Sequence, residues 1–273
     1  MTPKSASSAA TIDKITVEPS IAGIGQVAWD ACAAPGGIAP RAHPPNPFIT
    51  YDFLQALEET ECVAPATGWL AQHLVARDAS GQALAVMPCY LKSHSMGEYV
   101  FDHAWAQAFE AAGGDYYPKL QTCVPFTPVT GPRILCRPGV DTVTAIATLG
   151  AAARQLTRQH KASSLHITFA LPDECAGLEN AGFLHRTDRQ FHWVNDGYAD
   201  FDGFLAKLNS RKRKLIRRER GRALSDGITI EWLTGAAIEP RHWEAFFEFY
   251  LDTGSRKWGT PYLTREFFNL LGA

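Results

Sequence analysis

The densest group of chemically reactive side chains in the sequence lies between residues 92 and 133. It includes two carboxylates, Glu98 and Asp102, with the imidazole of His94 nearby. A carboxylate near a histidine can act as a general base toward an amine, provided that the groups are close in space and their pKa values suit proton transfer. Glu98, Asp102 and His94 are therefore the candidate catalytic residues.

Charged and aromatic side chains are interleaved throughout the same region. Loops held by a rigid sheet often carry function, and this mixture suits a pocket for an elongated polar ligand. We expect Lys119 and Arg133 to bind an anionic group of that ligand. The alternative is that the charges pair with one another and that residues 117–118 and 130–133 form turns. The candidate substrate-binding residues are Lys92, Tyr99, His103, Trp105, Tyr117, Lys119, Gln121, Thr127 and Arg133.

Several other chemistries find little support in the sequence. No metal ion is expected, because Gly97 and the alternation of Tyr99 with Phe101 speak against one helical face for the histidines and carboxylates. No Ser or Cys lies in a G-x-S-x-G-like turn. Residues 23–29 (GIGQVAW) have only the first two glycines of a dinucleotide-binding fingerprint. The six cysteines lack a C-x-x-C pair and are expected to be reduced and mostly buried.

A basic segment follows later in the chain. Residues 200–224 keep apolar side chains at helical spacing and predict a single helix, the second half of which is rich in Lys and Arg. Such a cluster can neutralise phosphates of RNA or of a nucleotide-linked substrate. The alternative is a solvated helix whose charges pair with acidic side chains elsewhere. The candidate phosphate or RNA contacts are Arg213, Lys214, Arg217 and Arg218.

The elements that position these residues read as an α/β pattern. A hairpin is expected to turn at Ser80-Gly81, and Gly182 suits a left-handed helix C-cap. Apolar periodicity predicts strands at 15–18, 69–77, 83–91, 119–124, 165–170 and 183–194, and helices at 24–32, 50–59, 104–112, 142–160 and 172–180.

Three short segments recur 213 or 214 residues later in the same order. ITVE at 15–18 returns as ITIE at 228–231, WDA at 29–31 as WEA at 243–245, and NPFITYDFL at 46–54 as TPYLTREFF at 260–268. The repeat predicts two copies of one unit, although two ordinary strand-helix-helix units with shared patterning are the alternative. The expected organisation is a disordered tail (1–13), a first unit (14–197), a basic connecting helix (198–226) and an incomplete second unit (227–273), so that the chain is a fragment.

Composition sets the broad class. The formal charge is −2, and no apolar run approaches the roughly 18 residues that a membrane helix requires. The N-terminus lacks the apolar segment of a signal peptide. A cytoplasmic protein without a membrane span is expected.

Several of these blocks resemble the FemAB-like family, a bacterial group named for peptidoglycan biosynthesis and placed in the GNAT acyltransferase superfamily. The resembling segments are residues 46–59 (NPFITYDFLQALEE), 90–106 (YLKSHSMGEYVFDHAWA), 116–133 (YYPKLQTCVPFTPVTGPR), 210–220 (SRKRKLIRRER) and 257–268 (KWGTPYLTREFF). The resemblance implies tandem GNAT-like units, each a mixed, mainly antiparallel sheet flanked by helices, the second of them truncated. It also implies an N-acyltransferase, and in the related Fem enzymes an aminoacyl group moves from tRNA to an amine of a peptidoglycan precursor.

The resemblance leaves the donor open between acyl-CoA and aminoacyl-tRNA, and the cofactor undetermined. The first unit contains no Q/R-x-x-G-x-G/A turn, which holds the CoA pyrophosphate in GNAT enzymes, and it is therefore not expected to bind CoA in that manner. The expected partners are a small-molecule or peptide acceptor and tRNA, with the oligomeric state undetermined. Two alternatives stay open: a non-catalytic module that binds a cell-wall precursor or peptide, and a protein that contacts RNA through the basic helix.

Overall fold

The computed structural model describes residues 10–34, 46–257 and 259–272. The chain forms two units, one of Met1–His185 with Pro240–Ala273 and one of Arg186–Glu239. Of the predicted tail, residues 1–9 lie outside the described part, whereas the backbone N–H of Asp13 donates to the carbonyl of Arg77 at 2.8 Å. The predicted division into tandem units at residues 14–197, 198–226 and 227–273 stays a prediction.

The first unit is built on two four-stranded sheets, as the α/β class predicted. One sheet has the order β1-β3-β4-β7, with every pair antiparallel: β1 (Lys14–Glu18), β3 (His73–Arg77), β4 (Ala83–Met87) and β7 (Leu135–Cys136). Gly81 lies in the turn between β3 and β4 with a φ of 90°, a value that favours glycine. The predicted hairpin is confirmed.

The second sheet has the order β2-β5-β6-β8, and it is mixed. Its strands are β2 (Trp69–Ala71), β5 (Tyr90–Lys92), β6 (Lys119–Thr122) and β8 (Leu165–Ile167). Only β6 and β8 among these pairs run parallel. Each arm of the hairpin contributes one strand to each sheet: β2 and β3 are separated at Gln72, and β4 and β5 at residues 88–89. The two arms stay joined at this crossing, where the N–H of Gln72 donates to the carbonyl of Cys89 at 2.8 Å.

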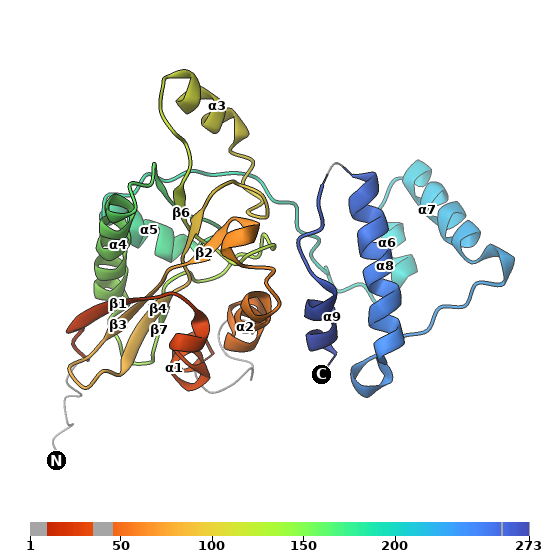
Figure 1. Ribbon diagram of the computed structural model, residues 1–273. Coiled ribbons are helices and arrows are strands. Elements are labelled where there is room, and N and C mark those ends of the chain that lie inside the picture. The colour runs from red at the N-terminus through yellow and green to blue at the C-terminus, as the bar shows by residue number, and fades with distance from the viewer. Residues whose placement is uncertain (1–9, 35–45, 258, 273) are drawn as a thin grey trace, which may run out of the picture. The chain divides into compact units, whose positions relative to one another are not determined.

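Helices cover both faces of these sheets (Figure 1). Because side chains alternate along a strand, Val75 of β3 packs in a core with α1 and α2, while Leu74 and Ala76 pack in a second core with α4 and α5. These helices are α1 (Gln26–Ala33), α2 (Tyr51–Glu59), α4 (Thr142–Gln159) and α5 (Pro172–Asn180). Short 3₁₀ turns lie at Ile21–Gly23, Pro47–Ile49, Pro65–Thr67, Ser225–Gly227 and Gly235–Ala237.

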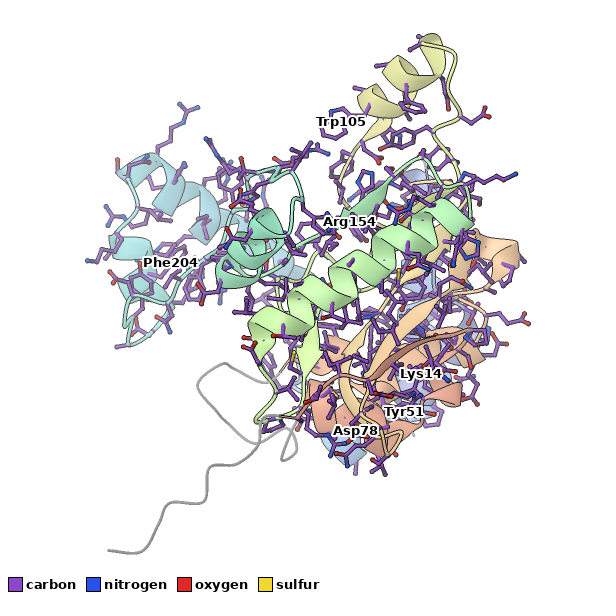
Figure 2. All side chains as sticks on the ribbon, turned by 90° about the vertical axis from the view of Figure 1, so that its left-hand side faces the viewer. Lys14, Tyr51, Asp78, Trp105, Arg154 and Phe204 are labelled. Atoms are coloured by element: carbon purple, nitrogen blue, oxygen red, sulfur yellow. The ribbon has the colours of Figure 1, made fainter. Side chains whose placement is uncertain are left out.

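Helix α3 (His103–Ala111) stands clear of the sheets, as both views show (Figures 1 and 2). Only Ala106 among its residues is buried, and the labelled side chain of Trp105 is half exposed. The loop before α3 leaves the second sheet at Lys92, and the loop after it returns at Lys119. This excursion therefore begins and ends at neighbouring positions of the sheet.

The first unit also contains α8 (Pro240–Arg256) and α9 (Arg265–Leu271). Phe267 of α9 is 2% exposed in the core that holds α1 and α2. The hydroxyl of Thr264 donates to the carbonyl of Thr60 at 3.2 Å. Helix α9 begins 214 residues after α2, and each helix follows a threonine N-cap, so this part of the sequence repeat has a structural counterpart.

The second unit contains two helices where the sequence predicted one: α6 (Phe201–Ala206) and α7 (Ser210–Ala223). The single long helix is wrong because Asn209 caps α7, accepting a hydrogen bond from the N–H of Lys212 at 2.9 Å. Asparagine is a poor residue for a helix interior and a strong N-cap, so the chain restarts there.

The strand predicted at 183–194 is wrong, and so is the strand that the repeat of residues 15–18 implies at 228–231. Residues 183–194 and 228–231 form no ladder with any described residue. Leu184 is 99% exposed and Phe191 is 90% exposed. Alternating apolar side chains favour a strand only where a neighbouring strand supplies backbone hydrogen bonds, and these segments have none among the described residues.

Candidate functional site

The candidate site is built on one face of the second sheet. The strand register places Trp69, Lys92 and Lys119 opposite one another on β2, β5 and β6. The next row on the same face contains Tyr90, Gln121 and His166 of β5, β6 and β8. Apart from His166, all of these side chains are buried. Buried polar residues on a sheet face need partners, and loop 93–118 supplies several of them.

Lys119 is the centre of a buried ion cluster. Its Nζ donates to Ser95 Oγ at 2.7 Å, to Glu98 Oε2 at 2.7 Å and to Asp102 Oδ2 at 2.6 Å. The three acceptors match the three donors of an ammonium group. Lys119, Glu98 and Asp102 are each at most 2% exposed. The prediction that Lys119 binds an anionic group of a ligand needs a correction here, because its N–H donors are directed to protein oxygens and not outward to an anion.

The same cluster contains acceptor atoms with no hydrogen-bond partner among the described residues. They are Glu98 Oε1, Asp102 Oδ1 and Gln121 Oε1, all buried. Gln121 uses its other atom, Nε2, to donate to Thr168 Oγ1 at 3.0 Å. These unpartnered oxygens of Glu98, Asp102 and Gln121 are all acceptors.

The two carboxylates of the cluster differ in pKa. Burial raises the pKa of Glu98, although Lys119 opposes the shift. Burial also acts to raise the pKa of Asp102, but hydrogen bonds from Lys119, Ser95 and Tyr116 outweigh it and hold this pKa well below its usual range. The hydroxyl of Tyr116 donates to Asp102 Oδ2 at 2.7 Å. Asp102 is thus a fixed anion, and Glu98 is the carboxylate of the two whose charge is less stable.

Lys92 lies beside this cluster in a different environment. Its Nζ is 3.2 Å from the centroid of the Trp69 ring and 3.4 Å from the carbonyl oxygen of Met96. The side chain has no exposed area. Burial lowers the pKa of Lys92 to about 7, with Glu98 opposing and Lys119 reinforcing the shift.

The segment that carries both carboxylates has an unusual backbone. Gly97, Tyr99 and Phe101 adopt positive φ values of 81°, 58° and 51°. Glu98 lies between the first two of these residues, and Asp102 directly follows the third. Left-handed conformations are costly for aromatic residues and persist only where the surroundings enforce them. At Gly97 a Cβ atom would lie 2.6 Å from the Phe126 ring, so glycine is required there.

His94, a predicted catalytic residue, does not join the ion cluster. Its Nδ1 accepts from the N–H of Met96 at 3.2 Å, so Nε2 carries the proton and donates to the carbonyl of Thr67 at 3.0 Å. Both ring nitrogens of His94 are thus hydrogen-bonded to backbone groups. Burial lowers the pKa of His94, and the positive charge of Lys92 adds to this effect.

Arg133, predicted to bind an anion, is also fully buried. Its Nε donates to the carbonyl of Thr168 at 2.8 Å, Nη1 to the carbonyls of Gly131 and Pro132, and Nη2 to that of Val129. These contacts fix the loop between β6 and β7, and they leave the guanidinium directed at the backbone instead of a ligand. The anion-binding role of Arg133 needs the same correction as that of Lys119.

The carboxylate of Glu174 complements this arrangement from α5. It accepts from the backbone N–H groups of Arg133 at 2.9 Å and Ile134 at 2.6 Å. Burial raises the pKa of Glu174, and these hydrogen bonds oppose the shift. Two buried charges therefore clamp one loop through its backbone.

The other predicted substrate-binding residues surround the cluster at varying distance from its centre. The hydroxyls of Tyr117 and Ser95 are 2.8 Å apart. Tyr99 is 42% exposed before α3, and His103 is exposed at the start of that helix. Thr127 lies half-buried in the loop after β6. The structure thus brings Glu98, Asp102, Lys92, Lys119 and Gln121 together, whereas His103 and Trp105 lie on the protruding helix.

Three contributors were missed from the sequence: Trp69, Ser95 and His166. Trp69 supports Lys92, Ser95 completes the coordination of Lys119, and His166 lies next to Gln121 in the strand register. Trp69 and His166 could have been found by counting alternate residues on neighbouring strands, had the register been known. Ser95 carries no comparable signal.

The predicted phosphate contacts lie in the second unit, on two sides of α7. Arg217 Nη2 is 2.8 Å from Asp202 Oδ1, and the Arg220 guanidinium is 4.0 Å from the Phe201 ring centroid, so this side of α7 faces α6. Helical spacing places Arg213 there too. The opposite side carries Arg211, Lys214, Arg218 and Arg222, which form no ion pair with any described residue.

No helix in the described part of the chain has the length and apolarity to cross a membrane. Comparison with protein families gives a match to the FemAB-like model, described as peptidoglycan biosynthesis/recognition, over residues 20–273. No curated protein and no solved structure was found to match. The family match spans the ion cluster, the clamped loop and the basic helix, and it confirms the resemblance of the sequence blocks. The chain belongs to the FemAB-like family.

Proposed function

We propose that this protein is an N-acyltransferase whose acceptor is an amine, with the acceptor amine bound between Glu98 and Asp102 of loop 93–118 and Gln121 of β6. The observation that carries the proposal is the set of three buried oxygens that accept from no described residue: Glu98 Oε1, Asp102 Oδ1 and Gln121 Oε1. An alkylammonium group offers three donors and a positive charge, which complements such a set. An anionic ligand would face two carboxylates there.

The family narrows the class of acceptor. Its description concerns peptidoglycan biosynthesis or recognition, and the amine of a peptidoglycan stem peptide is a group of the required chemistry. Tyr99 and Trp105, in loop 93–118, are about half exposed, and aromatic faces suit an elongated cationic chain. The acyl donor is an activated ester or thioester, for which aminoacyl-tRNA and acyl-CoA are the two candidates.

The Gln121→Met variant tests the amine site without breaking the ion cluster. We expect it to bind a stem peptide with a free side-chain amine about 10- to 150-fold more weakly, since one hydrogen bond to a charged group contributes about 1.5–3 kcal/mol. Calorimetry with this peptide and with its N-acetylated form measures the effect. Gln82→Met, in the exposed turn after β3, is the matched control and should bind normally.

Activity is tested by incubating the protein with the peptide and either aminoacyl-tRNA or acyl-CoA, then weighing the peptide by mass spectrometry. An added acyl group on the amine supports the transferase. Tight binding of the free amine with no acylation by either donor favours a non-catalytic binding module instead. Equal binding of free and acetylated peptides would contradict the amine site.

Phosphate binding by α7 is a second function with its own support. Its first turn contains no acidic residue and is followed by several cations, an arrangement that opposes the helix dipole. A polyanion on this surface would relieve the repulsion, and tRNA is the candidate that the aminoacyl donor supplies.

The two sides of α7 provide a matched pair of variants. Lys214→Gln with Arg218→Gln removes two charges from the side facing away from α6, and Arg213→Gln with Arg217→Gln removes two from the side facing it. We expect the first pair to weaken tRNA binding and to reduce the slope of log Kd against log salt by about 0.7–0.9 per lost contact. Equal losses from both pairs would indicate that net charge alone matters.

A further inference from the structure

The two lysines on the sheet face lie opposite each other on adjacent strands yet differ in their hydrogen bonds. Lys119 Nζ has three close acceptors, two of them carboxylates. Lys92 Nζ has one, the carbonyl oxygen of Met96 at 3.4 Å. A buried ammonium with most of its donors unpaired is costly, whereas a neutral amine needs fewer partners.

The groups that face Lys92 also bear on its charge. Lys119 on β6 and His94 in the following loop disfavour a second cation, while Glu98 and the buried thiol of Cys123 act in the opposite direction. The Trp69 ring attracts the charged form. Glu98 is already bound to Lys119 at 2.7 Å, which weakens its pull on Lys92. Desolvation is the largest influence, and it favours the neutral amine.

We propose that Lys92 is the general base of the acyl transfer. The inference rests on the proposed function and adds the group that receives the proton. Neutral Lys92 takes one proton from the bound ammonium of the acceptor, and the freed nitrogen lone pair attacks the acyl carbon of the activated ester or thioester. The new C–N bond makes that nitrogen positively charged and acidic, and it releases a second proton to water. The bond from the acyl carbon to the donor oxygen or sulfur breaks, and the ammonium of Lys92 gives its proton to that leaving group.

The other titratable groups are less suited to this step. Asp102 is held as an anion by Lys119 and Tyr116, so it is a weak base. Both nitrogens of His94 contact the backbone. Protonating Glu98 would deprive Lys119 of one of its two carboxylates. When Lys92 is neutral, its hydrogen bond to the carbonyl of Met96 uses a proton of the amine and leaves the nitrogen lone pair available.

Access to Lys92 depends on the segment above it. Residues 93–102 form neither a helix nor a strand ladder, and three of them adopt left-handed backbone. Lys92 Nζ contacts this segment through Met96. A bound acceptor that displaces only the carbonyl of Met96 would bring its amine to Nζ, while Glu98 and Asp102 stay bound to Lys119.

The first measurement is the titration of Lys92 by NMR, which requires no catalytic activity. The ¹³Cε resonance of Lys92 is assigned by its loss in Lys92→Arg. We expect a midpoint near 7, against about 10.4 for an ordinary lysine side chain. A midpoint near 10 would overturn the base, whatever the activity of the protein.

The second measurement is the pH dependence of kcat/KM for amine acylation. In the wild type it should rise with pH and level off above the Lys92 pKa, because the neutral form is the active one. Lys92→Gln and Lys92→Met should lower kcat/KM by about 10²–10⁴-fold and lose this rise, and Lys14→Gln should match the wild type. Folding of each variant is checked by circular dichroism, and Lys92→Met preserves the length of the chain in an apolar form.

The outcomes separate the two proposals. If the wild type transfers an acyl group and the Lys92 variants keep both the rate and the pH dependence, the base alone is wrong. If Lys92 titrates near 7 and the wild type transfers nothing from either donor, the transferase function fails and the base fails with it.

Discussion

Lys119→Met is expected to lower the free energy of unfolding by about 3–5 kcal/mol, because it removes the cation that binds the two buried carboxylates Glu98 and Asp102. Glu98 and Asp102 would then be buried anions without a counter-ion. Urea unfolding followed by circular dichroism measures the loss. Lys161→Met, on an exposed turn after α4, removes a lysine from the surface and should change stability by less than about 0.5 kcal/mol.

The pH dependence gives this prediction a sign. Without Lys119, the pKa values of Glu98 and Asp102 in the folded state would lie above their unfolded values near 4. The stability of the variant should then fall as the pH rises above about 4, because the unfolded state releases its protons first. In the wild type Asp102 acts oppositely, since its depressed pKa gives stability that is present above pH 4 and lost in acid.

A triple variant separates lost charge pairing from lost packing. Lys119→Met combined with Glu98→Gln and Asp102→Asn removes the buried charges together, and replacing a whole buried ion cluster is often nearly neutral. We expect the triple variant to regain most of the stability that Lys119→Met loses. The anomalous pH dependence of Lys119→Met should disappear in the triple variant. A triple variant as unstable as Lys119→Met would show that the methionine, and not the uncompensated charge, causes the loss.

Arg133→Met is the second large effect, expected at about 3 kcal/mol or more. Four backbone carbonyls would lose their donors inside the protein, and each unsatisfied buried group costs about 1–3 kcal/mol before relaxation. Arg133→Lys should recover only part of the loss, because an ammonium cannot reproduce the planar fork that reaches Thr168 and Val129 together. Arg158→Met, at the end of α4, is the control.

Hydrogen exchange locates the effect of Arg133→Met. The amides of Arg133 and Ile134 are held by Glu174, and they should lose protection in the variant while the amides of β3 keep theirs. Uniform loss of protection throughout the first unit would contradict a local clamp and indicate global destabilisation.

Much of the framework of the first unit followed from periodicity. The hairpin with its turn at Gly81, the long helix α4 and the left-handed Gly182 were confirmed. These features depend on local patterns: alternation, helical spacing and glycine at positive φ. The sequence also identified the region of the candidate site, since Glu98, Asp102, Lys92 and Lys119 do meet.

The polarity of that site could not be predicted. Lys119 suggested an anionic ligand because its partners were unknown, and the Lys119–Glu98 and Lys119–Asp102 ion pairs require the strand and the preceding loop to be folded against each other. Arg133 gave the same false signal for the same reason. Residue type shows which charges exist, but tertiary contacts decide which donors and acceptors are left for a ligand.

The unpaired segments show the opposite limit. Ile228 and Ile230 alternate with polar residues as β1 does at Ile15 and Val17, yet only β1 has a neighbouring strand among the described residues. Alternation of apolar and polar residues depends on one segment alone, whereas a β-strand forms only where a second segment supplies backbone hydrogen bonds. The tandem organisation that this alternation predicts is therefore not decided by local sequence.

The position of Phe267 has a consequence for biosynthesis. Phe267 packs among side chains of α1 and α2, and Thr264 is hydrogen-bonded to residues 60 and 62, about two hundred positions earlier. A nascent chain on the ribosome therefore exposes an apolar patch around Phe53, whose ring packs against that of Phe267, until α9 has been translated. Contacts of such long sequence separation slow folding, and this patch is the expected place for a chaperone to bind while synthesis continues.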